Sequence, residues 1–335
     1  MTPRIPDWFD AERFREHGQR VIDDLATFLE NSTTGNADQV LPWRDENALY
    51  ESWKDVLERD IELRQLFREV ADASIRLHHP RYLGHQISPS ATASALAGFV
   101  ADTLNNGMGV YEMGMAGTVL ERIIIDMLAR QFGFPSSASG FLTSGGSLGN
   151  LTALLAARNT ADPEVLETGN RDQRYAVMIS QQAHYCIQRA AGIMGWGRQG
   201  IISVPVDEHF SMRVDLLPQL FDQATQSGQR VVSVVGSACS TATGAYDDLA
   251  AIGQFCEQRD LWFHVDGAHG AAATFSPKYR HLLDGIEHAN SVTLDFHKML
   301  LVPALATALV FRDGRESYRS FAQKADYLFD EHEPE

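Results

Sequence analysis

Residues 230–265, RVVSVVGSACSTATGAYDDLAAIGQFCEQRDLWFHV, contain the pattern that decides the fold. An apolar run rich in valine (230–235) is followed by a helical pattern (249–258) and by a second apolar run (261–265). Runs this apolar are typical of strands buried on both faces, and a helix between two of them makes a βαβ unit. The stretch therefore predicts neighbouring parallel strands with a helix packed against them.

The same alternation continues on both sides of this stretch, after about residue 140. Further strand-like runs are 175–179, 201–204, 291–294 and 307–311, and further helical patterns are 185–194, 216–226 and 278–283. Repeated strand and helix patterns of this length favour one sheet over several small ones. We therefore expect an α/β fold with a mainly parallel sheet and helices on both faces.

The pattern of the N-terminal part differs, because it predicts helices and no strands. Apolar residues at helical spacing predict a one-sided helix over 10–30, followed by a polar linker over 31–38. Further helices are expected near 61–77, 91–104 and 118–132. Thr118 and Glu121 have the spacing of a capping box, and Gly133 is a typical stop signal.

Composition narrows the class of protein. The 335 residues carry 28 basic and 44 acidic side chains, a net charge of −16, and no basic block that could bind nucleic acid. No apolar run approaches the ~20 residues of a membrane span, and the polar start does not resemble a signal peptide. Cys186, Cys239 and Cys256 lack the spacing of disulfide or zinc sites. We therefore expect a cytoplasmic protein without a metal site.

Lysine is scarce, which limits where amine chemistry can occur. The four lysines are Lys54, Lys278, Lys298 and Lys324. Lys54 lies between acidic residues, Lys278 follows a proline and Lys324 lies in a polar segment, so these three are expected on the surface. Lys298 directly follows a strand-like run and has mainly apolar neighbours. Burial of a lysine disfavours the ammonium form and prepares an amine that can form a Schiff base.

A glycine-rich segment is a candidate anion site. Gly145, Gly146 and Ser147 come just before a helical pattern whose apolar face includes Leu151 and Leu154. Glycines let backbone N–H groups approach an anion, and a helix N-terminus adds a favourable dipole. The segment matches neither a Walker A loop nor the dinucleotide-binding fingerprint. The alternative is a plain strand-to-helix turn with Ser147 as its N-cap.

Two more polar residues follow strand-like runs. Asp266 follows 261–265, and a carboxylate at the end of a buried strand is costly unless a cation or a turn stabilises it. A plain turn at Asp266 and Gly267 is the alternative interpretation. His184 follows 175–179, where an imidazole either serves the local structure or stacks on a flat ligand ring.

These residues together suit one cofactor. Ligands of open α/β sheets bind at the carboxyl ends of the strands, so the candidates could share a site. Pyridoxal phosphate needs an anion cradle, an amine, a carboxylate for its ring nitrogen and a flat group over its ring. The glycine-rich segment, Lys298, Asp266 and His184 provide these four. The sequence therefore predicts pyridoxal phosphate bound covalently to Lys298.

Four motifs, in this order, resemble those of the group II pyridoxal-phosphate-dependent amino-acid decarboxylases. They are TSGGSLGNL (143–151), AHY (183–185), HVDGAHG (264–270) and DFHK (295–298). This family includes the aromatic amino acid, glutamate and diaminobutyrate decarboxylases, and it has the aspartate-aminotransferase-like fold (fold type I). The likeness runs from about residue 79 to 311. Segments 79–82 and 105–106 resemble the part of the family that borders the substrate pocket.

The resemblance implies a role for each motif residue. Lys298 would carry the cofactor as a Schiff base, and Asp266 would pair with the ring nitrogen. His184 and Ala268 would lie on opposite faces of the ring. The phosphate would be held by Gly145, Gly146, Ser147 and His297.

The implied reaction is decarboxylation of an L-amino acid to its amine, through a Schiff base and a quinonoid intermediate, in a homodimer. The implied domains are a helical dimerisation arm (1–75), the cofactor-binding large domain (76–315) and the start of a connection (316–335). Family members continue into a catalytic loop with a tyrosine and a small C-terminal domain, which we expect to be missing here; Tyr327 is not equated with that tyrosine. His269 replaces a common aromatic residue, and Asp295 replaces a common asparagine.

Three alternatives stay open on the sequence. An aminotransferase or another lyase of the same fold would use the same lysine and aspartate. A chain without the C-terminal region could also bind the cofactor and lack activity. The remote alternative is an α/β-hydrolase, because GGSLG fits G-x-S-x-G and Ser147, Asp266 and His297 follow in the order of its triad.

Overall fold

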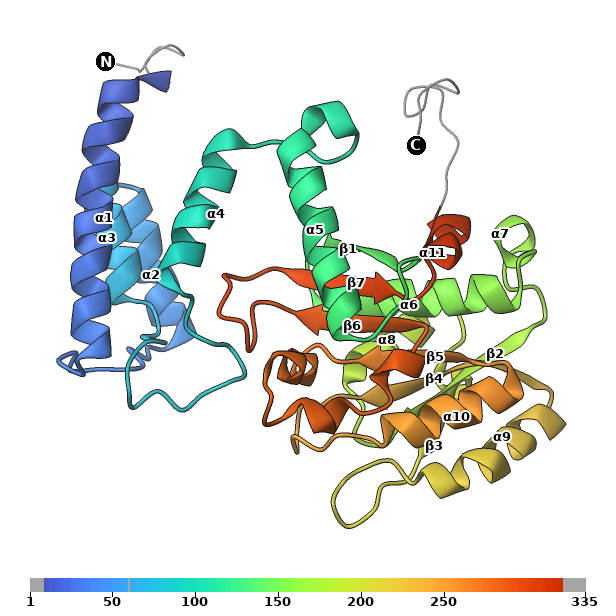
Figure 1. Cartoon of the computed structure of the whole chain (residues 1–335). Helices are drawn as coiled ribbons and strands as arrows, with labels where there is room; N and C mark the ends of the chain where they lie inside the picture. The colour runs from blue at the N-terminus through green and yellow to red at the C-terminus, as the bar shows by residue number, and fades with distance from the viewer. Residues whose placement is uncertain (1–8, 60, 322–335) are drawn as a thin grey trace. The chain divides into compact units, whose positions relative to one another are not determined.

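The computed structural model describes residues 9–59 and 61–321. Its contacts divide the chain into two compact units, Met1–Pro89 and Ser90–Glu335 (Figure 1). No helix in the described ranges combines the length and the apolarity needed to cross a membrane.

The first unit is helical. Its helices are α1 (Ala11–Thr33), α2 (Glu46–Leu57) and α3 (Leu63–Asp72). Asp10 caps α1 by accepting hydrogen bonds from the N–H groups of Glu12 and Arg13. Helix α1 extends three residues into the predicted linker, and α3 is shorter than the predicted helix over 61–77. Helix α2 was not predicted, although Leu49, Trp53 and Val56 recur along it at helical spacing.

The second unit begins with α4 (Thr92–Leu104) and α5 (Met115–Gln131). The predicted capping box in α5 is wrong, because the helix starts three residues earlier, after Gly114. Thr118 instead bonds back to the carbonyl of Gly114, at 3.0 Å. The Glu121 carboxylate accepts from the N–H of Leu142, at 3.1 Å, so it is used for a contact with a strand. The predicted stop is confirmed, since Gly133 has a φ of +74°.

A seven-stranded sheet forms the centre of the second unit. Its strands are β1 (Ser139–Thr143), β2 (Arg174–Ser180), β3 (Ile201–Val204), β4 (Gln229–Ser237), β5 (Trp262–Asp266), β6 (Ser291–Asp295) and β7 (Thr307–Phe311). Their order across the sheet is β1-β7-β6-β5-β4-β2-β3. Only β7 runs against its neighbours β1 and β6, so the expected mainly parallel sheet is confirmed.

Helices connect and cover these strands (Figure 1). They are α6 (Gly146–Ala161), α7 (Val165–Thr168), α8 (Tyr185–Ile193), α9 (Leu217–Gln226), α10 (Leu249–Arg259) and α11 (Gly314–Phe321). The helical pattern over 278–283 forms only a 3-10 helix, Arg280–Leu283. Its four residues cannot complete the turns that an α-helix needs for stability.

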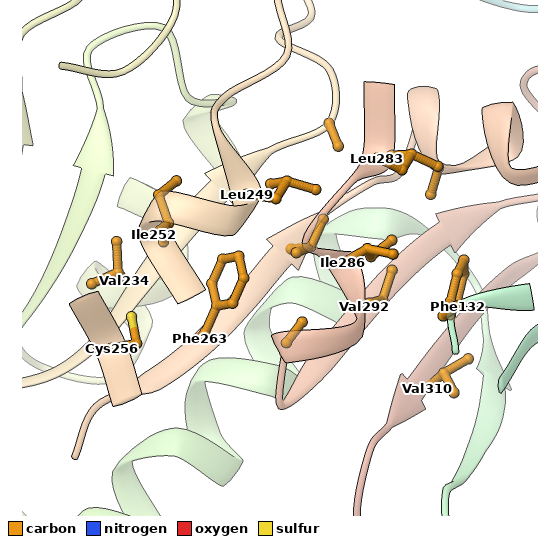
Figure 2. Packing of buried hydrophobic residues seen from close by; sticks show 14 of the residues in the cluster. Phe132, Val234, Leu249, Ile252, Cys256, Phe263, Leu283, Ile286, Val292 and Val310 are labelled. Atoms are coloured by element: carbon orange, nitrogen blue, oxygen red, sulfur yellow. The ribbon is translucent and has the colours of Figure 1, made fainter. Parts of the chain in front are cut away.

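Alternating side chains of the strands fill a core on each face of the sheet. In β2, Ala176 and Met178 pack in the cluster that includes residues of α5, α9 and α10. Val177 and Ile179, which follow these two residues, pack with α6 and α8. Figure 2 shows the first of these clusters, with Phe263 between the strands and α10. Successive side chains of a strand point to opposite faces, so both faces are apolar.

The register of the strands aligns polar residues at one edge of the sheet. Thr307, the first residue of β7, pairs with Thr143 at the end of β1 and with Asp295 at the end of β6. Because β7 is antiparallel to both neighbours, β1 and β6 end at the same edge. Strand β5 is parallel to β6 and ends at Asp266. The loops after these strands therefore meet at this edge.

Candidate functional site

A cavity of about 370 Å³ opens at this edge of the sheet. Its volume lies at the lower end of the range for small-molecule sites. The structure brings all eight predicted site residues to its lining: Gly145, Gly146, Ser147, His184, Asp266, Ala268, His297 and Lys298. They come from four separate segments between residues 145 and 298, so only the folded chain assembles them.

The glycine-rich segment forms one wall at the start of α6. The helix begins at Gly146, with Gly145 in the N-cap position and no side-chain cap. The alternative that made Ser147 the N-cap is therefore wrong. A Cβ atom on Gly146 would lie 3.1 Å from Ala268 Cβ and 3.1 Å from Asp295 Oδ1, so only glycine leaves this space open. The first N–H groups of a helix lack partners within it and are suited to bind an anion.

Asp266 lies at the end of the buried strand β5 and is only 8% exposed. Burial raises the pKa of its carboxyl group, while a hydrogen bond from Asn150, the N–H of Ala268 and the Lys298 charge lower it. The Ala268 N–H lies 3.3 Å from Asp266 Oδ1, so the residue also stabilises its own turn. A buried carboxylate with donors on one side and an open cavity on the other is suited to hold a cationic N–H group of a ligand.

His184 has a structural contact and also faces the cavity. Its Nδ1 accepts a hydrogen bond from the N–H of Cys186, at 3.3 Å, which makes it the N-cap of α8. Burial is the main cause that lowers its pKa, although the Asp266 charge opposes this effect. A neutral imidazole on the cavity wall can lie against a flat ring, so the two interpretations of this residue are compatible.

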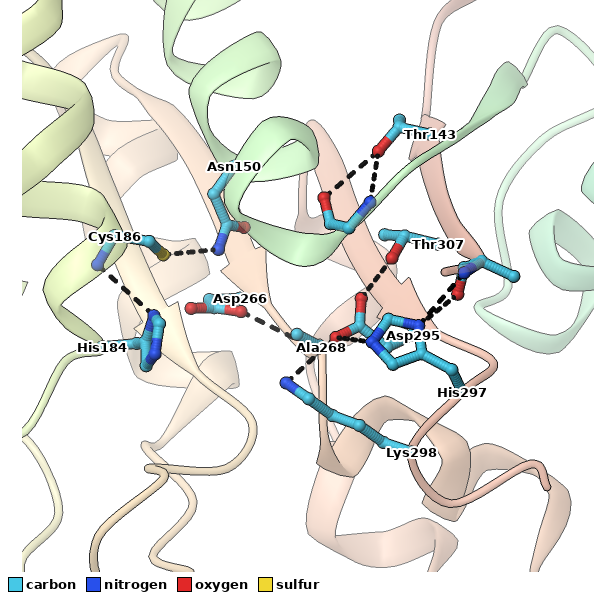
Figure 3. A network of polar contacts seen from close by, with 12 residues as sticks. Thr143, Asn150, His184, Cys186, Asp266, Ala268, Asp295, His297, Lys298 and Thr307 are labelled. Atoms are coloured by element: carbon cyan, nitrogen blue, oxygen red, sulfur yellow. Dashed lines mark hydrogen bonds and ion pairs between the residues drawn. The ribbon is translucent and has the colours of Figure 1, made fainter. Parts of the chain in front are cut away.

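Lys298 also lines the cavity and forms an ion pair with the buried Asp295 (Figure 3). Its Nζ lies 2.9 Å from Asp295 Oδ2, and the lysine side chain is 24% exposed while that of Asp295 is 2% exposed. Thr307 donates to Asp295 Oδ1 at 2.5 Å, across the β6–β7 pair. His297 Nε2 lies 3.6 Å from Asp295 Oδ2. This cluster directs the amine towards the cavity.

The other lysines do not compete for this role. Lys54 and Lys278 are exposed, as predicted, and the Lys278 amine lies over the ring of Tyr279. Lys324 and Tyr327 lie outside the described residues.

The cavity lining also contains residues that the sequence did not predict. Asn150, Cys239 and Thr241 all contribute to the cavity wall. Asn150 stands within the first quoted motif, but a buried amide has no local sequence signal that reveals its partners. Burial raises the pKa of the neighbouring Cys186 thiol to about 12, so this cysteine stays a neutral acceptor.

The hydrolase alternative is not supported by the geometry. Within the described ranges, no hydrogen bond joins Ser147 to His297 or His297 to Asp266. His297 Nδ1 instead contacts the backbone of Ala306, at 2.9 Å from its oxygen and 3.2 Å from its nitrogen. A catalytic triad needs both contacts, so this interpretation is rejected.

The chain is similar to known decarboxylases over most of its length. The chain is 34% identical to the L-aspartate decarboxylase of Metarhizium robertsii over 268 residues, which cover 80% of this chain and 54% of that protein. It is 32% identical to the L-2,4-diaminobutyrate decarboxylase of Acinetobacter baumannii, over 79% of this chain and 55% of that protein. The chain thus spans about half the length of these relatives.

A solved structure shows the same fold over most of the chain. The crystal structure of mouse CSAD superimposes with a TM-score of 0.89 at 27% identity, over 96% of this chain and 69% of that one. The predicted fold type I architecture is thereby confirmed. The family model described as the pyridoxal-dependent decarboxylase conserved domain matches residues 57–334. The chain belongs to the pyridoxal-dependent decarboxylase family.

Proposed function

We propose that the chain binds pyridoxal 5'-phosphate in this cavity and takes part in the decarboxylation of an L-amino acid. One observation carries the proposal: the amine of Lys298, the carboxyl group of Asp266 and the N-terminus of α6 line the same cavity. These groups match an aldehyde, a ring nitrogen and a phosphate, and the space beside Gly146 would be filled by any side chain at that position. The residues therefore fit the cofactor of the family.

Each residue then has a task. When bound, the cofactor supplies an aldehyde that takes up amines and a ring that accepts the electron pair left at Cα when carbon dioxide departs. Lys298 would hold the aldehyde carbon, and Asp266 would keep a proton on the ring nitrogen. The N–H groups of Gly146 and Ser147 would hold the phosphate, with His297 close by. Ala268 and His184 would confine the two faces of the ring.

The substrate class follows from the names of the relatives. These act on aspartate and on 2,4-diaminobutyrate, which share an α-amino and an α-carboxyl group and differ in the charge of the side chain. His269 lines the cavity and stands at the position where many family members have an aromatic residue. Burial lowers the pKa of its imidazole. We take a small L-amino acid as the substrate, in a cytoplasmic enzyme.

The proposal includes a homodimer. Helix α5 leaves Leu120, Ile123 and Met127 exposed, and α4 leaves Leu96 and Val100 exposed. Exposed apolar residues that recur along a helix mark contact surfaces. In this proposal the helical arm (1–75) and these helices bind a second copy, and residues 76–315 hold the cofactor.

The experiment begins with the cofactor. The full chain is incubated with pyridoxal phosphate, reduced with borohydride and digested, and the labelled peptide is identified by mass spectrometry. The label should lie on Lys298, and Lys298→Ala should show none, whereas Lys278→Ala should be labelled like the parent. A label elsewhere, or none, contradicts the proposal.

A panel of amino acids then tests the reaction. Aspartate, glutamate, 2,4-diaminobutyrate and aromatic amino acids are incubated with the loaded protein, and carbon dioxide and keto acids are both measured. Release of carbon dioxide with a matching amine supports decarboxylation. A keto acid without carbon dioxide indicates an aminotransferase, and a label on Lys298 with neither product indicates a cofactor-binding chain without activity.

A further inference from the structure

Behind the cavity, four buried polar side chains form a continuous series of hydrogen bonds. They are Trp262, Ser291, His264 and Asn150, all 5% exposed or less, from β5, β6 and α6. Trp262 Nε1 lies 2.9 Å from Ser291 Oγ, and Ser291 Oγ lies 2.8 Å from His264 Nδ1. His264 Nε2 lies 2.8 Å from Asn150 Oδ1. No local sequence pattern predicts a role for any of them.

The direction of the series is set at its two ends. An indole N–H can only donate, so Ser291 Oγ accepts from Trp262 and has its own proton left to donate. At the other end, the amide nitrogen of Asn150 donates to Cys186 Sγ, at 3.2 Å (Figure 3). A hydrogen bond from the same side chain lowers the pKa of the Asp266 carboxyl group. The amide oxygen of Asn150 must therefore accept, which requires a proton on His264 Nε2.

The imidazole of His264 links the two ends of the series. Complete burial lowers its pKa to about 3, so the ring is neutral near pH 7 and carries a single N–H. With the proton on Nε2, Nδ1 is an acceptor and accepts a hydrogen bond from the hydroxyl group of Ser291. The competing arrangement places the proton on Nδ1, which would donate to the Ser291 carbonyl oxygen at 3.1 Å. Asn150 would then turn and present its oxygen to the Asp266 carboxylate, an arrangement of two acceptors that repel each other.

We propose that Trp262, Ser291, His264 and Asn150 form a one-way chain of hydrogen-bond donors that ends on Asp266 and orients its carboxylate towards the cavity. They are positioning residues, since none of them except Asn150 lines the cavity. The effect on a ring nitrogen rests on the proposed function, whereas the order of the donors does not.

The chain offsets the cost of burying Asp266. Burial favours the protonated acid, and the Lys298 and His184 charges oppose this effect. The Cys186 and Cys239 thiols are further titratable groups that interact with Asp266. When the oxygen of an amide accepts a hydrogen bond, the amide is polarised and its N–H group becomes a stronger donor. Asn150 therefore stabilises the ionised carboxylate of Asp266. The Asp266 oxygen that does not contact Asn150 stays directed at the cavity.

The test reads the proton on His264 directly. The full chain is labelled with ¹⁵N-histidine, and two-bond ¹H–¹⁵N spectra near pH 7 distinguish the two neutral tautomers; loss of one signal set in His264→Gln assigns the residue. The proposal expects the Nε2–H tautomer in the unmodified protein. The Nδ1–H tautomer or a doubly protonated ring would overturn it, and this result needs no variant to fold.

A matched set of serine variants tests the direction of the chain. In Ser291→Ala, the only remaining partner of His264 Nδ1 is the carbonyl oxygen of residue 291, so His264 should change to the Nδ1–H tautomer. The titration midpoint of Asp266, followed by ¹³C detection, should then rise by about one pH unit. Ser291→Thr keeps the hydroxyl and should preserve both signals. The control is Ser233→Ala, because Ser233 is buried next to Trp262 in the sheet and its hydroxyl has no partner among the described residues.

The outcomes separate this inference from the proposed function. The expected tautomers without a borohydride label on Lys298 would support the donor chain and reject cofactor binding. A label on Lys298 together with an unchanged His264 tautomer in Ser291→Ala would support cofactor binding and reject the chain. In the loaded protein, Ser291→Ala should also shift the pH dependence of the cofactor absorbance, and Ser233→Ala should not.

Discussion

Asp266 and Asp295 show how single residues at this site are stabilised in a buried position. Each carboxyl group is 8% exposed or less. Asp266 receives N–H donors from Asn150 and Ala268, whereas Asp295 is paired with Lys298 and Thr307. A buried charge without such partners would cost several kcal/mol. The partners therefore fix which acid faces a ligand and which one holds the lysine.

Asp266→Asn should keep the cofactor bound and slow turnover by about 10³-fold. The amide has nearly the same shape but no charge to hold a proton on the ring nitrogen, so the ring becomes a weaker electron acceptor. Steady-state rates of carbon dioxide release, together with the absorbance of the bound cofactor, measure both parts. Near-full turnover in this variant would show that the charge of Asp266 is not needed.

Lys298→Met should lower the free energy of unfolding by about 1–3 kcal/mol, because the Asp295 carboxylate stays buried without its nearest cation. Adding Asp295→Asn to this variant should recover most of the loss. Urea unfolding of the two single variants and the double variant measures the coupling, with the exposed Lys278→Met as the control. Strictly additive losses would mean that the 2.9 Å contact contributes no stability.

At the scale of elements, strand β7 decides how the cavity walls are spaced. It lies between β1 and β6 and is antiparallel to both. Through Thr307 it connects Thr143, just before the glycine-rich segment, with Asp295. The close approach of β1 and β7 depends on Gly140, where a Cβ atom would lie 2.2 Å from the Leu309 carbonyl oxygen.

Gly140→Val should therefore separate β1 from β7 and displace the start of α6. We expect weaker cofactor binding, by about tenfold or more, and a loss of about 1–3 kcal/mol of stability. Fluorescence titration with pyridoxal phosphate and thermal unfolding measure these effects. Gly192→Ala is the control, because this glycine in α8 has nothing within 4 Å of an added Cβ, and it should be neutral or stabilising. Unchanged binding in Gly140→Val would show that β1 does not set the position of the cradle.

At the scale of the whole molecule, the stability of the fold should depend on acidity through His264. Its pKa is lowered to about 3 in the folded state, against about 6.5 in an unfolded chain. Between these values the unfolded state binds a proton that the folded state does not, so stability is full above pH ~6.5 and falls as the pH falls. The expected slope from this one group is about 1.4 kcal/mol per pH unit.

Urea unfolding between about pH 4.5 and 6.5 tests this dependence. His264→Gln should be less stable near pH 7 and should lose less stability on acidification than the parent, because its side chain does not titrate. His281→Gln, at an exposed histidine, should keep the slope of the parent. Equal slopes in all three proteins would place the acid sensitivity in other groups.

The proposed homodimer makes a second prediction at this scale. Leu120→Glu places a charge on the exposed apolar face of α5 and should convert a dimer into monomers at micromolar concentration. Sedimentation velocity measures the change, and Leu166→Glu, at an exposed leucine of α7, should leave the dimer intact. A monomeric parent protein, or a dimer that persists in Leu120→Glu, would contradict the proposed contact surface.

The sequence by itself determined the alternating strands and helices and the eight candidate site residues. Both are encoded locally: buried parallel strands need continuous apolar runs, and a phosphate cradle, an amine and an acid need particular residues directly after strands. For the same reason a prediction from local patterns is wrong where a distant contact decides the outcome. Thr118 and Glu121 match a capping box, but the helix starts earlier and the strand at Leu142 binds the glutamate.

Only the tertiary structure decided which buried groups contact each other. The role of β7 as a spacer between β1 and β6 and the series from Trp262 to Asn150 join segments that lie far apart in the sequence. Hydrogen-bond direction depends on the geometry of all partners at once, and no single residue or spacing carries that information.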